Sequence, residues 1–229
     1  MKSLLMMLVI TAINSCDAKR PATDTSAIST GKTILALGDS YTIGESVLKE
    51  QSFPYQLAKQ LNADGIKTEN PKVIAQTGWT TSDLLGAIES EKLTVKYDVV
   101  TLMIGVNNQY SGGSQETFRK EFNQLLDTAI SHSKTGAAGV FVISFPDWTV
   151  TPFGREQGFK GPSAEVDTFN AISKQETAKR EINYIDITPA SRIAESDRSL
   201  IAGDGLHPSG KMYGEWVRAV YPLVKGHWK

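Results

Sequence analysis

The stretch DVVTLMI, residues 98–104, is an almost uninterrupted apolar run that leads directly into Gly105-Val106-Asn107-Asn108. A strand with both faces covered by helices has this composition, because neither face meets water. Other runs of the same kind are residues 33–37, 72–75, 139–145 and 182–187. Segments with helical periodicity separate them, and this alternation predicts βαβ units around a parallel sheet.

Apolar residues three or four positions apart mark the helices between these runs. The segments predicted as helices are 52–63, 82–91 and 115–131, one that carries Val166, Phe169 and Ile172, and a last one that starts near Ser209. Ser209 is suited to cap that last helix, and Thr80 or Thr81 to cap the helix at 82–91. The whole pattern predicts a single α/β domain.

Composition excludes several functional classes. The chain has 229 residues, 24 Lys and Arg against 25 Asp and Glu, and a formal charge of -1. This balance gives no general attraction to nucleic acid or to an acidic membrane surface. One Cys excludes an internal disulfide, and three widely spaced His disfavour a metal cluster. We therefore expect no metal and no cofactor.

The N-terminus has the pattern of an export signal. Lys2 precedes an apolar segment at 4–13, which is too short to span a bilayer. The sequence that follows, Ile13-Asn14-Ser15-Cys16, resembles a bacterial lipobox. We expect residues 1–15 to be a signal peptide that is removed, and Cys16 to carry a lipid that anchors the protein to a membrane of the cell envelope. An ordinary secretory signal with an incidental Cys is the alternative.

Residues 16–31 are rich in Ala, Ser and Thr and lack apolar periodicity, which is typical of a flexible tether. The predicted domain is therefore 32–229. Polar residues follow its predicted strands: Gly38-Asp39-Ser40, Gln76-Thr77-Gly78 and Gly105 to Asn108, with Asp204-Gly205-Leu206-His207-Pro208 before the last helix. Ligands bind beyond the carboxyl ends of strands in open parallel sheets, so these segments are the candidate site.

These segments contain the parts of a serine hydrolase. Ser40 is the candidate nucleophile, His207 the candidate base, and Asp204 the acid that orients the imidazole. Candidate oxyanion donors are the backbone N–H groups of Ser40 and Gly78 and the side-chain amide of Asn107. Together they predict hydrolysis through an acyl-enzyme.

Competing residues fit less well. His132 ends a predicted helix away from the sheet edge, and His227 lies two residues from the C-terminus. Asp39 is adjacent to Ser40 and its side chain is expected to point elsewhere. A phosphate-binding loop at Ser40, as in a flavin-binding module, is an alternative that leaves Asp204 and His207 unexplained.

GDSYT (38–42), the Gly78 segment, GVNN (105–108) and DGLHP (204–208) together resemble the GDSL or SGNH hydrolases over essentially all of 32–229. The resemblance implies a flavodoxin-like, three-layer α/β/α sandwich, hydrolysis of esters or thioesters, and no metal. Three positions depart from the family pattern. Asn108 stands where Asp is usual, Thr81 where a second Gly is usual, and Tyr41 where the family name has Leu.

The segment 146–163, with Trp148, Phe153 and Phe159, is predicted to wall the pocket, although these aromatic residues also suit a loop that simply packs down. We expect a serine esterase acting on short-chain acyl or acetyl-carbohydrate esters. Alternatives are a lysophospholipase or thioesterase on lipid acyl groups, and a catalytically silent binding protein.

Overall fold

The computed structural model describes residues 31–228, so the predicted signal peptide and Cys16 lie outside the described residues. Five parallel strands form one sheet in the order β2-β1-β3-β4-β5. The strands are β1 (Ile34–Asp39), β2 (Lys72–Gln76), β3 (Val99–Met103), β4 (Val140–Ile143) and β5 (Asn183–Ile185). The predicted α/β fold is confirmed.

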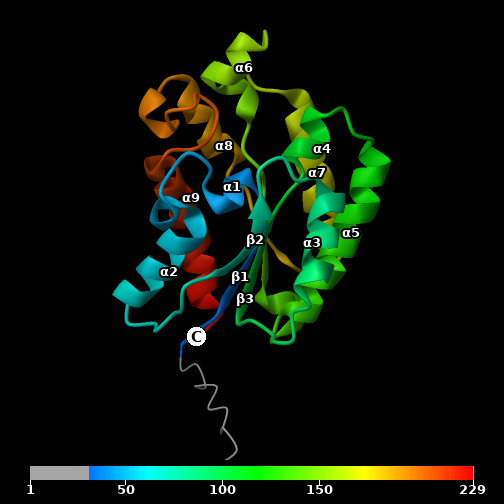
Figure 1. Ribbon diagram of the computed structural model, residues 1–229, viewed down its shortest axis with the longest axis vertical. Coiled ribbons are helices and arrows are strands. Elements are labelled where there is room, and N and C mark those ends of the chain that lie inside the picture. Colours follow the sequence, from blue (N-terminus) through cyan, green and yellow to red (C-terminus); the bar gives the residue numbers. More distant parts are fainter. Residues whose placement is uncertain (1–30, 229) are drawn as a thin grey trace, which may run out of the picture.

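Helices cover both faces of this sheet. The long ones are α2 (Phe53–Ala63), α3 (Thr81–Glu91), α5 (Gln115–His132), α7 (Ala164–Ala178) and α9 (Gly210–Gly226). The short ones are α1 (Ser40–Ile43), α4 (Val106–Tyr110), α6 (Pro152–Glu156) and α8 (Thr188–Ser191), with 3₁₀ turns η1 (Lys49–Gln51), η2 (Gly136–Gly139), η3 (Trp148–Val150), η4 (Arg192–Glu195) and η5 (Arg198–Leu200). Figure 1 shows α2 and α9 on one side of the sheet and α3, α5 and α7 on the other, which makes the three layers.

The burial of the strands follows their order in the sheet. Every residue of β1 and of β3 is buried, as expected for central strands under two helical layers. The edge strand β2 instead begins and ends with the exposed residues Lys72 and Gln76. The hydrophobic sequence at 98–104 thus marks the middle of the sheet.

The register brings the polar segments to one edge. Gly38 lies opposite Ala75 on one side and Met103 on the other, and Asp39 lies opposite Gln76. Since the three strands are parallel, Ser40, Thr77 and the segment after Met103 leave the sheet together. This is the carboxyl edge on which the candidate site was predicted.

β4 and β5 are each three residues shorter than predicted, and β3 is one residue shorter at each end. At the end of β4, Phe145 exchanges hydrogen bonds with the Asn170 side chain, which donates to Phe145 O (2.9 Å) and accepts from Phe145 N (3.1 Å). Before β5, the N–H of Ile182 donates to Thr177 O at the end of α7 (3.3 Å). These bonds satisfy the backbone locally and remove both residues from the sheet.

The helix caps agree with the predictions. Ser209 is the N-cap of α9, and its hydroxyl accepts the N–H of Met212. Thr80, rather than Thr81, caps α3 in a capping box with Asp83. Across residues 31–228, no helix has the length and apolarity needed to span a bilayer.

Candidate active site

A small cavity of about 160 Å³ lies at the carboxyl edge of the sheet. Its lining is mostly apolar around a few polar groups and consists of Ser40, Tyr41, Thr77, Gly78, Val106, Asn107, Tyr110, Trp148, Phe153, Leu206 and His207. Residues from four separate segments predicted to carry the chemistry therefore share one pocket. A concave apolar site with few polar groups is the usual form of a small-molecule site.

Ser40 lies at the turn from β1 into α1. It is the first helical residue, so its N–H belongs to the helix donors that lack an intrahelical partner. Asp39 caps this turn, since its Oδ1 accepts the N–H of Tyr41 (3.0 Å). The Asp39 side chain is fully buried, and burial raises its pKa to about 7. Within the described chain, Asp39 Oδ2 has no hydrogen-bond partner.

Asp204, and not Asp39, contacts the imidazole. His207 Nδ1 lies 2.6 Å from Asp204 Oδ2, and because a carboxylate only accepts, the proton is on Nδ1. Asp204 Oδ1 also accepts the backbone N–H groups of Leu206 (2.9 Å) and His207 (3.0 Å). Since Asp204 binds Nδ1, Nε2 is the ring nitrogen of His207 that remains to accept a proton, and His207 lines the pocket.

The Asp204 carboxylate is held in its charged form. Partial burial acts to raise its pKa, but hydrogen bonds from Ser46, His207 and two backbone N–H groups outweigh burial and hold the pKa well below its usual range. The Ser46 hydroxyl donates to the same oxygen, Oδ2, at 2.6 Å. No pattern in the sequence indicated Ser46, because it lies 158 residues from Asp204.

Gly78 lies in the turn between β2 and α3, Asn107 lies in the short helix α4, and both line the pocket. Gly78 has φ +84°, a conformation in which any other side chain is strained. One N–H of the Asn107 side-chain amide donates to Trp79 O (2.9 Å), and the amide has a second N–H to donate. A Cβ on Gly105, at φ +128°, would lie 2.8 Å from the Phe118 ring, so glycine is required before Asn107.

Three aromatic residues of the segment 146–163 were predicted to wall the pocket, and two of them line it. Trp148 is 4% exposed, and its Nε1 donates to Gln109 Oε1 (2.8 Å), while Gln109 Nε2 donates to Glu165 (2.7 Å). Phe153 also lines the pocket. Phe159, in contrast to the prediction, does not: it packs edge-on against Trp148, with ring centroids 4.8 Å apart, and its other side meets solvent.

Several residues that line the pocket were not predicted from the sequence. Tyr110 lines the pocket, is half exposed, and packs edge-on against Trp148 with centroids 5.1 Å apart. The Tyr41 ring lies 5.5 Å from that of His207. In α4, Val106 directly precedes Asn107 and Tyr110 follows it by three residues, and this closeness in sequence was the only available signal. Leu206 is a neighbour of His207 in the chain.

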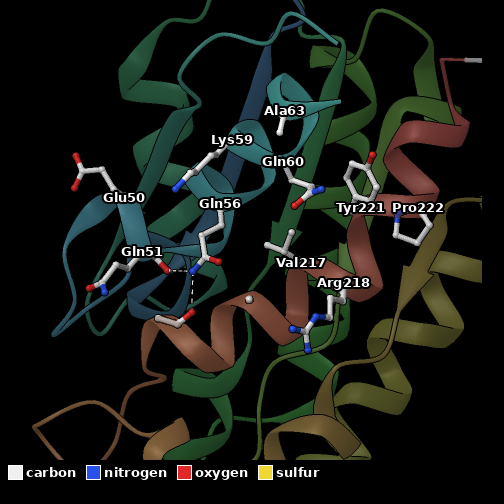
Figure 2. A pocket seen from close by; sticks show the side chains of 12 residues that line it. Glu50, Gln51, Gln56, Lys59, Gln60, Ala63, Val217, Arg218, Tyr221 and Pro222 are labelled. Carbon is white, nitrogen blue, oxygen red and sulfur yellow. Dashed lines mark hydrogen bonds between the residues drawn. The ribbon is translucent and has the colours of Figure 1, made fainter. Parts of the chain in front are cut away.

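A larger hollow of about 790 Å³ lies between α2 and α9 (Figure 2). Its lining contains Gln51, Gln56, Gln60, Lys59 and Arg218 but neither Ser nor His. Figure 2 shows Gln56 bonded to the backbone; its Nε2 donates to Gln51 O (2.6 Å) and Gly210 O (2.8 Å). Size alone therefore does not identify the reactive site.

The other two histidines lie elsewhere. His132 ends α5, and His227 caps α9 with its Nε2 3.2 Å from Thr135 Oγ1. In the part of the chain that the structure describes, no group of three or more His, Cys, Asp or Glu side chains is placed to hold a metal ion.

The sheet order and the polar edge define an SGNH-type hydrolase fold. The chain belongs to the GDSL-like lipase/acylhydrolase family, whose model matches residues 36–214. Membership makes the protein a hydrolase of ester bonds. A comparison with curated protein sequences finds no significant match.

Solved structures share this fold. The lipase/acylhydrolase from Enterococcus faecalis has a TM-score of 0.68 at 22% identity, covering 85% of this chain and 96% of that one. A G-D-S-L lipolytic protein from Veillonella parvula has a TM-score of 0.66 at 17% identity, covering 85% and 99%. The acetyl xylan esterase AlAXEase has a TM-score of 0.67 at 15% identity, covering 84% and 99%.

Proposed function

We propose that the protein is a serine esterase that hydrolyses carboxylic esters with short acyl groups through an acyl-enzyme on Ser40. The observation that carries this proposal is the His207–Asp204 pair, which directs an imidazole into the same pocket as Ser40, Gly78 and Asn107. The test is ester hydrolysis by the purified protein together with covalent labelling by a fluorophosphonate.

The proposed reaction begins with proton transfer from Ser40 Oγ to His207 Nε2 as Oγ attacks the acyl carbon. The carbonyl oxygen becomes negative and accepts hydrogen bonds from the N–H groups of Ser40 and Gly78 and from the Asn107 amide. His207 then gives its proton to the leaving alkoxide, which completes the acyl-enzyme. In the second half, His207 activates water, which attacks the acyl carbon and releases the acid and Ser40.

Asp204 supports both halves of this cycle. Its carboxylate accepts the Nδ1–H of His207, which fixes the tautomer and stabilises the imidazolium that forms. Ser46 and the two backbone donors hold the carboxylate in place. Asp39 takes no part in the proposed cycle, since it serves as the cap of α1.

Asn107→Ala is expected to lower kcat by about 10²–10³, the usual cost of one oxyanion donor. The measurement is steady-state hydrolysis of an acetyl ester. Asn123→Ala is the matched control, because Asn123 is in α5 and does not line the pocket. An unchanged kcat in Asn107→Ala would show that the oxyanion is bound elsewhere.

The pocket favours a short acyl group. An apolar cavity of about 150 Å³ holds a molecule the size of benzene, and the pocket here is of similar size, about 160 Å³. The buried Trp148 limits it, held by hydrogen bonds through Gln109 to Glu165. The half-exposed Tyr110 ring suits a sugar as the alcohol, so acetylated carbohydrate is the substrate class we favour over lipid acyl groups.

Trp148→Ala is expected to shift the acyl preference toward longer chains. The ratio of kcat/KM for an octanoyl ester to that for an acetyl ester should rise about tenfold or more, since a single methylene is worth roughly that much in a fitted pocket. Trp228→Ala, a change outside the pocket lining, should leave the ratio unchanged. An unaltered ratio in Trp148→Ala would contradict Trp148 as the limit.

We further propose that the protein is exported and anchored to a membrane of the cell envelope through lipid on Cys16. The apolar segment at 4–13 and the Cys at the expected cleavage point support this. Incorporation of labelled fatty acid that persists in Cys16→Ser would contradict it.

A further inference from the structure

We propose that Asn108, Thr81 and Glu121 form a hydrogen-bond relay that positions the oxyanion donors Gly78 and Asn107. The relay contains Asn108, which stands where the family usually has Asp, and Thr81, which stands where it usually has a second Gly. Its role in catalysis rests on the function proposed above.

The side-chain hydrogen bonds run in one direction, from Asn108 through Thr81 to Glu121, and the backbone N–H of Thr81 adds a bond back to Asn108. Thr81 N donates to Asn108 Oδ1 (3.0 Å), and Asn108 Nδ2 donates to Thr81 Oγ1 (2.8 Å). The Thr81 hydroxyl in turn donates to a carboxylate oxygen of Glu121 in α5. Thr81 is fully buried and Asn108 is 8% exposed, so water does not substitute for these partners.

This direction dictates an amide at position 108. The Thr81 hydroxyl has one hydrogen, and the Glu121 carboxylate, which only accepts, takes it. Asn108 must then supply a donor to Thr81 Oγ1, as its Nδ2 does. An aspartate at 108 offers only acceptors, and two carboxylates would compete for one hydrogen. Thr81 and Asn108 therefore depend on one another.

The relay joins the two segments that carry the oxyanion donors, which are the turn before α3 and the short helix α4. Asn107 Nδ2 is bonded to Trp79 O, and Asn108 is bonded to Thr81, so two consecutive residues of α4 hold the two segments together. Gly78 immediately precedes Trp79. The distance from the Gly78 N–H to the Asn107 amide is therefore set by these contacts. Neither Thr81 nor Asn108 lines the pocket, which makes them positioning residues.

The test compares four proteins: the unaltered chain, Asn108→Asp, Glu121→Gln and the double variant. Asn108→Asp should lower kcat about tenfold or more with KM within about twofold, because misplacement of a donor by an ångström or less costs that much. Glu121→Gln should stay close to the unaltered kcat, since its amide oxygen still accepts from Thr81. The double variant should regain most of the lost kcat, because the introduced amide of Glu121→Gln then donates to Thr81 Oγ1 and the Thr81 hydrogen goes to the introduced carboxylate.

Equal kcat in Asn108→Asp and the unaltered chain would overturn the relay, as would a double variant no faster than Asn108→Asp. If Asn108→Asp does not fold, Thr81→Ala and Thr81→Ala with Asn108→Asp are compared instead. These two should have equal kcat, because no hydroxyl remains to be shared, and a further loss in the second overturns the relay.

The unaltered protein by itself tests the proposed function, through its ester hydrolysis and its reaction with a fluorophosphonate. An unaltered chain that neither hydrolyses esters nor binds a fluorophosphonate overturns the proposed function and the catalytic role of the relay with it. An active unaltered chain with no difference among the variants overturns the relay alone.

Discussion

Ser40→Ala is expected to abolish ester hydrolysis while the fold is kept. Loss of the nucleophile in a serine hydrolase costs roughly a millionfold in kcat, and only the background from binding and the oxyanion donors is left. Turnover of an acetyl ester measures the loss, and thermal unfolding checks the fold. Ser90→Ala is the matched control, because Ser90 lies in α3 with its hydroxyl bonded to Gly86 O.

Covalent labelling separates this role from a structural one. A fluorophosphonate should label the unaltered chain at Ser40 and leave the Ser40→Ala variant unlabelled. Hydrolysis at an undiminished rate in that variant would show that another group attacks the ester. Absence of labelling in an intact, folded chain would favour a silent binding protein on the same fold.

His207→Ala is expected to have an effect of similar size, because nucleophile and base act as a unit. Fluorophosphonate labelling of Ser40 should slow as well, since the serine hydroxyl is a weak nucleophile until a base removes its proton. The measurement is the labelling rate beside kcat. A merely structural histidine would change both only through unfolding.

His132→Ala is the control for His207→Ala. His132 ends α5 and does not line the pocket, so its removal should leave kcat and labelling unchanged. Equal losses in the two variants would contradict the assignment of His207 as the base.

The fold was predictable from the sequence because its signals are local. The central strand β3 is a continuous apolar run, and the helices between the strands show regular apolar spacing. The end of β4 and the start of β5 were not predictable, because the Asn170 side chain and the Thr177 carbonyl bind backbone groups there. These bonds depend on packing that a single sequence does not show.

The candidate site was predictable where topology determines it. Parallel strands end at one edge, so Ser40, Gly78 and Asn107 meet there, and Asp204 reaches His207 because it lies three residues away in the same loop. The contact of Ser46 with Asp204 was not predictable. It depends on two loops far apart in the sequence. The position of Phe159 behind Trp148 depends on side-chain packing in the same way.

The reactive edge is assembled from segments that begin at residue 38 and end at residue 208, and this has a consequence for folding. Parallel strands pair only after long crossovers close, which is slow compared with helix formation. The loop with Asp204 and His207 is fixed late in the chain, by the bridge between Ile201 and Pro208 and by α9 behind it. During refolding, helical circular dichroism should therefore recover before esterase activity, which makes turnover a reporter of the completed sheet.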